Sequence, residues 1–93
     1  MRPDVARVVY TAYNADGDPL YVGATSHLLN RLRMHERSSA WWAGAAWLSV
    51  SEPMNREDSM NAERDLIRAL RPPHNIQHNP DRRHELKRRA RAA

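Results

Sequence analysis

Five polar side chains of the sequence have the types that hydrolysis of a phosphodiester bond requires. Such a reaction needs a base to activate water, a cation to offset the charge of the transition state and a metal ion to stabilise the leaving oxygen. Tyrosine or histidine can act as the base, arginine supplies the cation, and a carboxylate binds the metal. The candidates are Tyr10, Tyr21, Arg31, His35 and Glu63. They are widely separated in the chain, so the elements between them must bring them together.

The two tyrosines are expected on the two strands of a β-hairpin. Residues 5–13 are rich in Val, Tyr and Thr and predict a strand, and residues 20–23 predict the returning strand. Between them, Asp16-Gly17 is a strong signal for a two-residue turn. Residues that lie directly opposite each other in such a hairpin point to the same face of the sheet.

This turn pairs Ala12 with Tyr21 and Tyr10 with Gly23, so the two phenols become diagonal neighbours on one face. Two phenols together can position a water or a phosphate oxygen, or they can form only a packed cross-strand patch. Gly23, at the end of its strand, permits close approach of another group to the backbone.

The remaining elements follow from capping residues and chain breakers. They are a helix over residues 27–37 capped by Ser26, a strand over 45–51 that ends near Pro53, a helix over 56–70 between Asn55 and Pro72-Pro73, and a short basic helix that starts at Asn79-Pro80. The order β-β-α-β-α with a C-terminal tail predicts a small α+β fold in which helices pack on a sheet.

In the first helix, a cation and an imidazole are expected to be neighbours. Arg31 and His35 are four residues apart and therefore share one helix face. They flank the apolar stripe marked by Leu28 and Leu32, which places them at the rim of a cleft. The alternative is an exposed arginine–histidine pair with no functional role.

In the second helix, a carboxylate falls on the apolar side. Met60, Leu66, Ile67 and Leu70 form the apolar stripe, and Glu63 lies near its middle. An inward carboxylate is costly unless it is paired with a cation or binds a metal. Two interpretations follow, namely a glutamate paired with an arginine or a ligand for a hard cation such as Mg²⁺ or Mn²⁺.

Taken together, these residues resemble the motifs of the GIY-YIG nuclease family, specifically its small stand-alone members. Val8-Val9-Tyr10 is similar to the first half-motif and Tyr21-Val22-Gly23 to the second, with the tyrosines eleven positions apart. Val8 stands where the family has a glycine. The similarity spans residues 8–76 and includes Arg31 and His35 of an R-x-x-x-H helix, Glu63 as the metal-binding glutamate and Asn75 of a Pro-x-Asn segment.

The resemblance implies a three-stranded antiparallel sheet flanked by helices. It also implies an endonuclease that hydrolyses DNA with a single Mg²⁺ or Mn²⁺ ion. In such an enzyme Tyr10, as a phenolate or through a water, would be the general base, and His35 would accept or relay the proton. Tyr21 would hydrogen-bond the phosphate or the attacking water.

The resemblance implies three further roles. Arg31 would stabilise the negative charge of the transition state, Glu63 would hold the cation against the leaving 3′ oxygen, and Asn75 would support the site by hydrogen bonding. A free phenol has a pKa of about 10, so Tyr10 would need Arg31, His35 and the cation to act near neutrality.

The composition limits the classes of protein to consider. The 93 residues predict one small domain, at residues 1–80, and a basic tail, at residues 81–93. The absence of cysteine excludes a disulfide framework, a cysteine-based zinc site and a thiol nucleophile. No apolar run approaches the roughly 20 residues of a membrane-spanning helix, and the N-terminus lacks the apolar stretch of a signal peptide. We therefore expect a cytoplasmic protein.

Basic charge is concentrated in the tail. Residues 1–80 contain nine Lys+Arg and nine Asp+Glu, whereas residues 81–93 contain six basic and two acidic side chains. Such a tail binds phosphates without choosing a sequence, or it is only a solvated segment. The candidate nucleic-acid-binding residues are Gly23, Arg33, Arg82, Arg83, Lys87, Arg88 and Arg89.

Three tryptophans lie within seven residues of one another, at positions 41, 42 and 47. A short domain without phenylalanine needs large apolar side chains, so at least two tryptophans are expected in the core. We assign Trp47 to the core, and Trp41 or Trp42 to a rim that faces DNA, where an indole can stack on a base.

Two other functions stay open. The chain could be a nucleic-acid-binding module that kept the fold and lost the chemistry, or a protein-interaction domain whose basic tail binds an acidic partner. The presence of Arg31 and Glu63 favours the enzyme. The expected partner is DNA, including branched or damaged DNA in repair or recombination. With little room for a recognition domain, specificity would come from the shape of the DNA, a homodimer or a partner protein.

Overall fold

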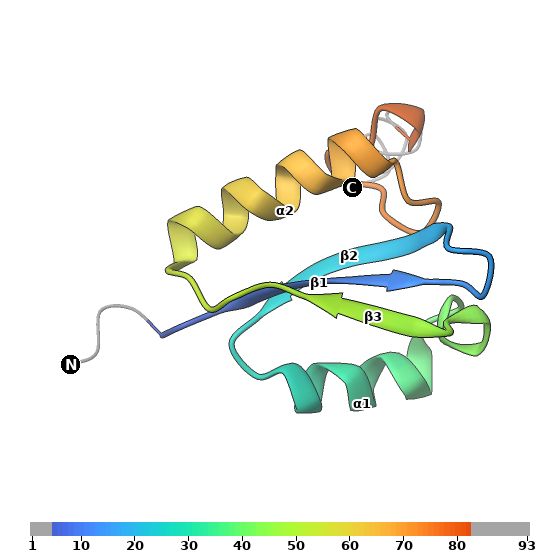
Figure 1. Ribbon diagram of the computed structural model, residues 1–93, viewed down its shortest axis with the longest axis horizontal. Helices are drawn as coiled ribbons and strands as arrows, with labels where there is room; N and C mark the ends of the chain where they lie inside the picture. Colours follow the sequence, from blue (N-terminus) through green and yellow to red (C-terminus); the bar gives the residue numbers. More distant parts are fainter. Residues whose placement is uncertain (1–4, 83–93) are drawn as a thin grey trace, which may run out of the picture.

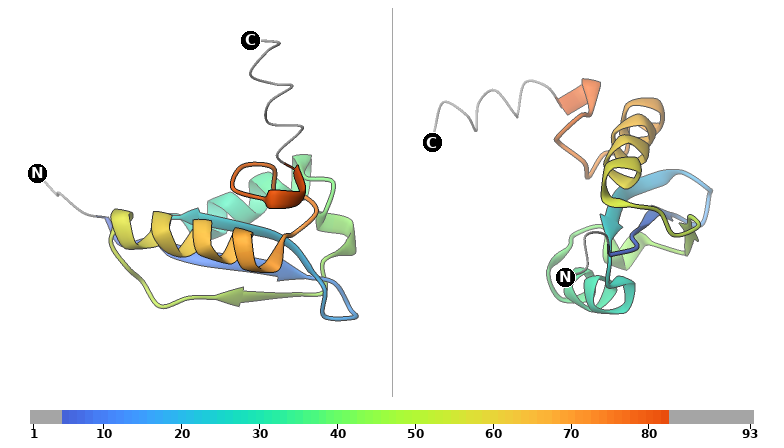
Figure 2. Two further views of the ribbon diagram at one scale, coloured as in Figure 1. Left: turned by 90° about the horizontal axis from the view of Figure 1, so that it is seen from above. Right: turned by 90° about the vertical axis from the view of Figure 1, so that its left-hand side faces the viewer.

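The computed structural model describes residues 5–82 and has an α+β architecture. In chain order the elements are β1 (Val8–Tyr13), β2 (Pro19–Thr25), α1 (Leu28–Ser38), the 3₁₀ turn η1 (Trp42–Gly44), β3 (Trp47–Val50), α2 (Arg56–Leu70) and the 3₁₀ turn η2 (Pro80–Arg82). The strands form one antiparallel sheet in the order β2-β1-β3, with α1 and α2 on opposite faces (Figures 1 and 2). The predicted α+β class and three-stranded antiparallel sheet are confirmed.

The β1–β2 hairpin has the predicted pairing but a different turn. Tyr10 pairs with Gly23 and Ala12 with Tyr21, as predicted. The loop is longer than two residues, because Tyr13 pairs with Pro19 and the register shifts just after Ala12. A bulge therefore absorbs the additional loop residue and leaves the two predicted pairs in place.

Asn14 organises this loop. Its side-chain Oδ1 accepts hydrogen bonds from the backbone N–H groups of Asp16 and Asp18, at 3.0 and 2.9 Å. Gly17 has a φ of 86°, a left-handed conformation that glycine adopts without steric cost. The prediction of a two-residue turn at Asp16-Gly17 was wrong, because this asparagine closes a wider loop.

The hydrophobic core lies between the sheet and α2. Val9, Val22 and Ile67 are buried at its centre, and Ala24, Met54, Ala62, Leu66 and Leu70 pack around them. The predicted stripe was wrong at Met60, which is 53% exposed. The inward face of α2 is rotated toward Ala62 and Leu66, which leaves Met60 on the opposite edge of the stripe.

Helix α1 covers the other face and begins one residue later than predicted. Its N-cap is His27 and not Ser26, and no side chain caps it. Instead, Thr25 Oγ1 accepts the backbone N–H of His27 at 3.0 Å, so the turn before the helix is held by a different hydroxyl. For α2 the predicted bounds and the Asn55 cap are confirmed, since Asn55 Oδ1 accepts the N–H of Asp58 at 2.7 Å.

The tryptophans do not fill the core as predicted. Trp41 is buried, Trp42 is half-buried, and Trp47 is 51% exposed. Trp47 lies on the edge strand β3, opposite Tyr13, and its indole stacks on the Tyr13 ring at 4.1 Å between centroids. The assignment of Trp47 to the core was therefore wrong, because cross-strand stacking takes the place of burial.

The outer edge of β2 is covered by the segment that follows α2. Asn75 Oδ1 accepts the N–H of Val22 at 2.7 Å, and its Nδ2 donates to the carbonyl of Val22 at 2.9 Å. Asn79 Nδ2 donates in turn to the carbonyls of Pro72 and Asn75. The buried amide of Asn75 thus pairs with β2 as another strand would. Among residues 5–82 there is no helix with the length and apolar character needed to cross a membrane.

Gly23 is required by the close packing of Tyr10. A Cβ atom built on Gly23 would overlap the hydroxyl and Cζ of the Tyr10 side chain. Both groups belong to the interior of the fold, since Tyr10 and Gly23 are buried. The glycine therefore makes room for the phenol that faces it across the hairpin.

We expect Gly23→Ala to lower the free energy of unfolding by about 1–3 kcal/mol, because the added methyl group must displace the Tyr10 ring. Urea denaturation measures the change. Gly44→Ala is the matched control, because the nearest atom to its added methyl is Leu20 Cδ1 at 3.9 Å. Equal stability of the two variants would contradict the steric role of Gly23.

Candidate active site

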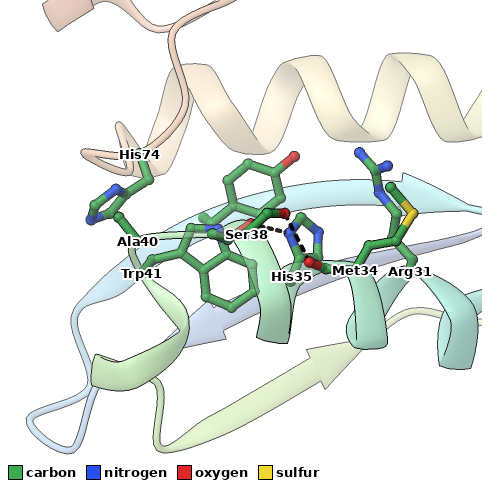
Figure 3. A pocket seen from close by; sticks show the side chains of 9 residues that line it. Arg31, Met34, His35, Ser38, Ala40, Trp41 and His74 are labelled. Carbon is green, nitrogen blue, oxygen red and sulfur yellow. Dashed lines mark hydrogen bonds between the residues drawn. The ribbon is translucent and has the colours of Figure 1, made fainter.

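Several predicted residues meet at a pocket on the α1 side of the sheet. The pocket has a volume of about 370 Å³. Arg31 and His74 lie toward its two ends, with His35 and Trp41 between them (Figure 3). Tyr21 completes the predicted set that lines it. The remaining lining residues are Met34, Ser38, Ser39 and Ala40.

Tyr10, His35 and Ser39 form a chain of hydrogen bonds. The hydroxyl of Tyr10 lies 2.7 Å from Nε2 of His35, and Nδ1 of His35 lies 2.6 Å from Oγ of Ser39. A neutral imidazole with its proton on Nδ1 satisfies both contacts, since it accepts from Tyr10 and donates to Ser39. Both ring nitrogens of this buried histidine are thus engaged.

Aromatic contacts fix the orientation of the imidazole and of the second phenol. The rings of Tyr10 and Tyr21 are 6.2 Å apart between centroids, and Tyr21 stacks on Trp41 at 5.2 Å. The His35 ring packs on both Tyr21 and Trp41, at 5.1 and 4.7 Å. Tyr10 itself is fully buried and does not line the pocket, so Tyr21 is the phenol at its surface.

Burial and neighbouring charges set the protonation states of this chain. Burial raises the pKa of Tyr10 to about 12, against the opposing effects of the hydrogen bond and charge of Arg31. Burial, followed by the charge of Arg31, lowers the pKa of His35 below its ordinary value. Near neutral pH, therefore, Tyr10 keeps its proton and His35 is a neutral acceptor.

Arg31 connects the two phenols. Its pKa is raised by a hydrogen bond to Tyr10 and by further interactions with Tyr10 and Tyr21, so its positive charge is firmly retained. The alternative of an exposed Arg31–His35 pair was wrong, because Arg31 is half-buried and His35 is buried. The side of α1 that carries both residues faces the sheet, not the solvent.

Glu63 lies on α2 and does not line the pocket, although its charge interacts with Tyr10 and Arg31. Its carboxylate accepts a hydrogen bond from the backbone N–H of Ala24. Burial raises its pKa, while the charges of Arg7 and Arg31 oppose this rise. Within residues 5–82 the ion pairs are Arg64–Asp65 and Arg71–Asp81, so the direct ion pair that one interpretation required is not formed by Glu63.

The described residues are compatible with a divalent cation held by one carboxylate. They contain no group of three or more His, Cys, Asp or Glu side chains that could enclose a metal. Mg²⁺ does not need such a cage, because it commonly binds one or two carboxylates and completes its shell with water and substrate phosphate. The half-buried Glu63, free of an ion pair, offers this kind of oxygen donor.

The other predicted residues have different surroundings. Asn75 supports the edge of β2 beside the Tyr21 position, and Gly23 packs under Tyr10. Arg33 is exposed on α1 and does not line the pocket. Arg82 ends η2, while Arg83, Lys87, Arg88 and Arg89 lie outside the described residues.

Ser39, Trp41 and His74 belong to the site but were not singled out for it. Ser39 is four residues after His35 and could have been found by this spacing, although it lies just beyond the end of α1. Trp41 was considered only for a rim, whereas it packs on His35 and Tyr21. His74 was dismissed as a metal ligand, and its backbone N–H bond to Leu20 holds it beside β2.

Comparisons of the chain with protein-family models, with curated proteins and with solved structures give no match. The assignment of function therefore rests on the residues and their geometry.

We expect His35 to titrate below the ordinary histidine pKa of about 6.5. NMR of the ring protons measures this directly. Arg31→Gln should raise the pKa of His35 because it removes a nearby positive charge, whereas Arg33→Gln on the exposed face should not. The unfolded chain binds this proton more tightly, so His35 makes the free energy of unfolding fall as pH drops through the ordinary value. A pKa at or above 6.5 would contradict this account.

Proposed function

We propose that this chain is a metal-dependent DNA endonuclease of the GIY-YIG type. The observation that carries the proposal is the meeting of Tyr10, Tyr21, Arg31 and His35 at one site, with the charge of Glu63 acting on it from α2. These residues come from three separate elements, and a packing role alone does not require this combination of types. The order of elements and the three-stranded antiparallel sheet are compatible with that family's fold.

The proton of the attacking water passes to the Tyr10–His35 pair. Because the pKa of Tyr10 is about 12, its phenolate is scarce near neutrality, and His35 at 2.7 Å supplies the acceptor. Ser39 holds the imidazole in the tautomer that can accept this proton. Since Tyr10 is fully buried, a water reaches its hydroxyl only after a neighbouring side chain moves.

Tyr21 and Arg31 contact the scissile phosphate. Both line the pocket, and Arg31 retains its charge at all relevant pH values. A guanidinium can donate two parallel hydrogen bonds to phosphate oxygens and so offset the negative charge that develops in the transition state.

Glu63 would hold a divalent cation, which would supply Lewis-acid stabilisation of the leaving 3′ oxygen. Burial of this carboxylate raises its pKa, yet Arg7 and Arg31 favour its charged form. The position of the half-buried Glu63 carboxylate is fixed, because α2 packs on the sheet through Ile67, four residues further along. Asn75 positions β2, and with it Tyr21, by holding both polar groups of Val22.

We expect the protein to nick supercoiled plasmid DNA with Mg²⁺ or Mn²⁺. Glu63→Gln and Arg31→Gln should each reduce the rate by at least about 100-fold, because each removes an interaction with charge that develops in the reaction. Agarose gels of plasmid over time measure the rate. Glu57→Gln, exposed in the first turn of α2, is the control that should keep the wild-type rate.

Robust nicking by folded Glu63→Gln would contradict the metal assignment. DNA binding without nicking by the unaltered chain would favour the inactive binding module, and absence of DNA binding would favour the protein-interaction domain.

The basic tail is expected to strengthen DNA binding without taking part in catalysis. Removing residues 83–93 keeps the Arg71–Asp81 ion pair and the η2 turn. The slope of log affinity against log salt should flatten by at least roughly 2, because fewer counterions are released. Fluorescence anisotropy at several salt concentrations measures the slope, while saturated turnover should change much less. An unchanged slope would count against this role.

A further inference from the structure

His74 lines the pocket at the opposite end from Arg31, with His35 and Trp41 between them (Figure 3). Arg31 and His35 are already about 6 Å apart along the axis of α1, because a helix rises about 1.5 Å per residue. His74 lies beyond His35 in the same direction. A phosphate held by Arg31 therefore leaves His74 without a contact, unless the bound molecule extends along the pocket.

The backbone of His74 is held in place by the residues on both sides of it. Its N–H donates to the carbonyl of Leu20 at 3.2 Å. Asn75, the next residue, makes two hydrogen bonds with the backbone of Val22, and Pro72 is fully buried. This end of the pocket is thus a fixed part of the fold, although no helix or strand contains His74.

The imidazole of His74, unlike that of His35, is available to a ligand. His74 is exposed, and among residues 5–82 its ring makes no hydrogen bond, ion pair or ring contact. Both ring nitrogens of His35 are already engaged, one by Tyr10 and the other by Ser39. An imidazole carries an N–H donor whether it is neutral or charged, so His74 can bind an anion in either state.

The lining of the pocket suits an anion along its whole length. None of the lining residues is Asp or Glu, and Tyr21, Arg31 and His74 can each donate a hydrogen bond to an anion. Between the two ends, Trp41 stacks on Tyr21 at 5.2 Å between centroids and gives the wall an aromatic surface. The pocket is therefore complementary to phosphates joined by a sugar and a base, because a base packs well on aromatic side chains.

We propose that His74 binds the phosphate adjacent to the scissile one, so that the pocket holds two successive phosphates of one DNA strand. This inference rests on the proposed function and deepens it, because it names the segment of the substrate that the pocket recognises. Arg31 and Tyr21 bind the first phosphate and His74 binds the second, with the nucleoside between them against the aromatic wall. His74 binds substrate here and takes no part in proton transfer.

The test compares two ligands that differ by one phosphate, a thymidine dinucleotide with one phosphate and a thymidine trinucleotide with two. The titrations contain EDTA and no divalent cation, so that neither ligand is cleaved. The trinucleotide should bind the unaltered chain roughly three- to tenfold more tightly than the dinucleotide, because it adds a hydrogen bond to a charged group at a partly exposed position. NMR titration of the backbone amide signals measures both affinities.

His74→Ala should lose most of this gain and leave the affinity for the dinucleotide unchanged. His27→Ala is the matched control and should keep the gain, because His27 is exposed, does not line the pocket and makes no side-chain hydrogen bond at the start of α1. His74→Lys again offers donors to a phosphate and should recover the gain. Circular dichroism confirms that each variant is folded.

A trinucleotide with one methylphosphonate linkage separates phosphate binding from contacts of the additional nucleoside. It keeps every sugar and base but has a single charged phosphate, so it should bind the unaltered chain no more tightly than the dinucleotide. Equal affinity of this ligand and the ordinary trinucleotide would assign the gain to the nucleoside and overturn the role of His74.

The nicking assay gives an independent measurement. His74→Ala should raise KM by roughly three- to tenfold and leave kcat unchanged, because a contact made equally in the bound substrate and the transition state affects binding alone. Nicking by the unaltered chain, with the same trinucleotide gain or the same KM in His74→Ala, would overturn the role of His74 and leave the proposed function intact. Absence of both nicking and DNA binding would overturn the proposed function and this inference together.

Discussion

The burial of the Tyr10 phenol against Gly23 is the constraint on which the site depends. The ring fills the space that any side chain at position 23 would need, and its hydroxyl then meets His35 at 2.7 Å. Because His35 in turn packs on Tyr21 and Trp41, one close backbone approach aligns the whole aromatic cluster. The same burial raises the pKa of Tyr10 to about 12, so the packing that orders this phenol also keeps it protonated. The packing that stabilises the fold therefore disfavours the phenolate of Tyr10, while His35 lies within hydrogen-bond distance of its hydroxyl.

Prediction from the sequence succeeded for features that depend on interactions between residues close together in the chain. The bounds of α2 and its Asn55 cap follow from capping chemistry and proline breakers, which operate within a few residues. The Tyr10–Gly23 pairing follows from hairpin register, and it holds although the turn is different, because a bulge compensates for the longer loop. The expected meeting of Tyr10 with His35 depended on the resemblance to a family as well as on helix periodicity.

The remaining features depend on tertiary contacts that spacing does not encode. Trp47 is exposed because stacking on Tyr13 across the sheet replaces burial. Met60 is exposed because the buried face of α2 is formed by Ser59 and Ile67, with Ala62 and Leu66 beside them. The pairing of Asn75 with Val22 joins residues 53 positions apart, which no local pattern predicts.

The hydrogen bonds of Asn75 to the edge of β2 also bear on the order in which the fold is completed during synthesis of the chain. The amide that satisfies Val22 is synthesised long after the hairpin that it closes. A contact of such long sequence separation has a larger loop-closure cost than the pairing within the hairpin. The edge of β2 can therefore be closed only after residue 75 has been synthesised, when both phenols, Arg31, His35 and Glu63 are already in the chain.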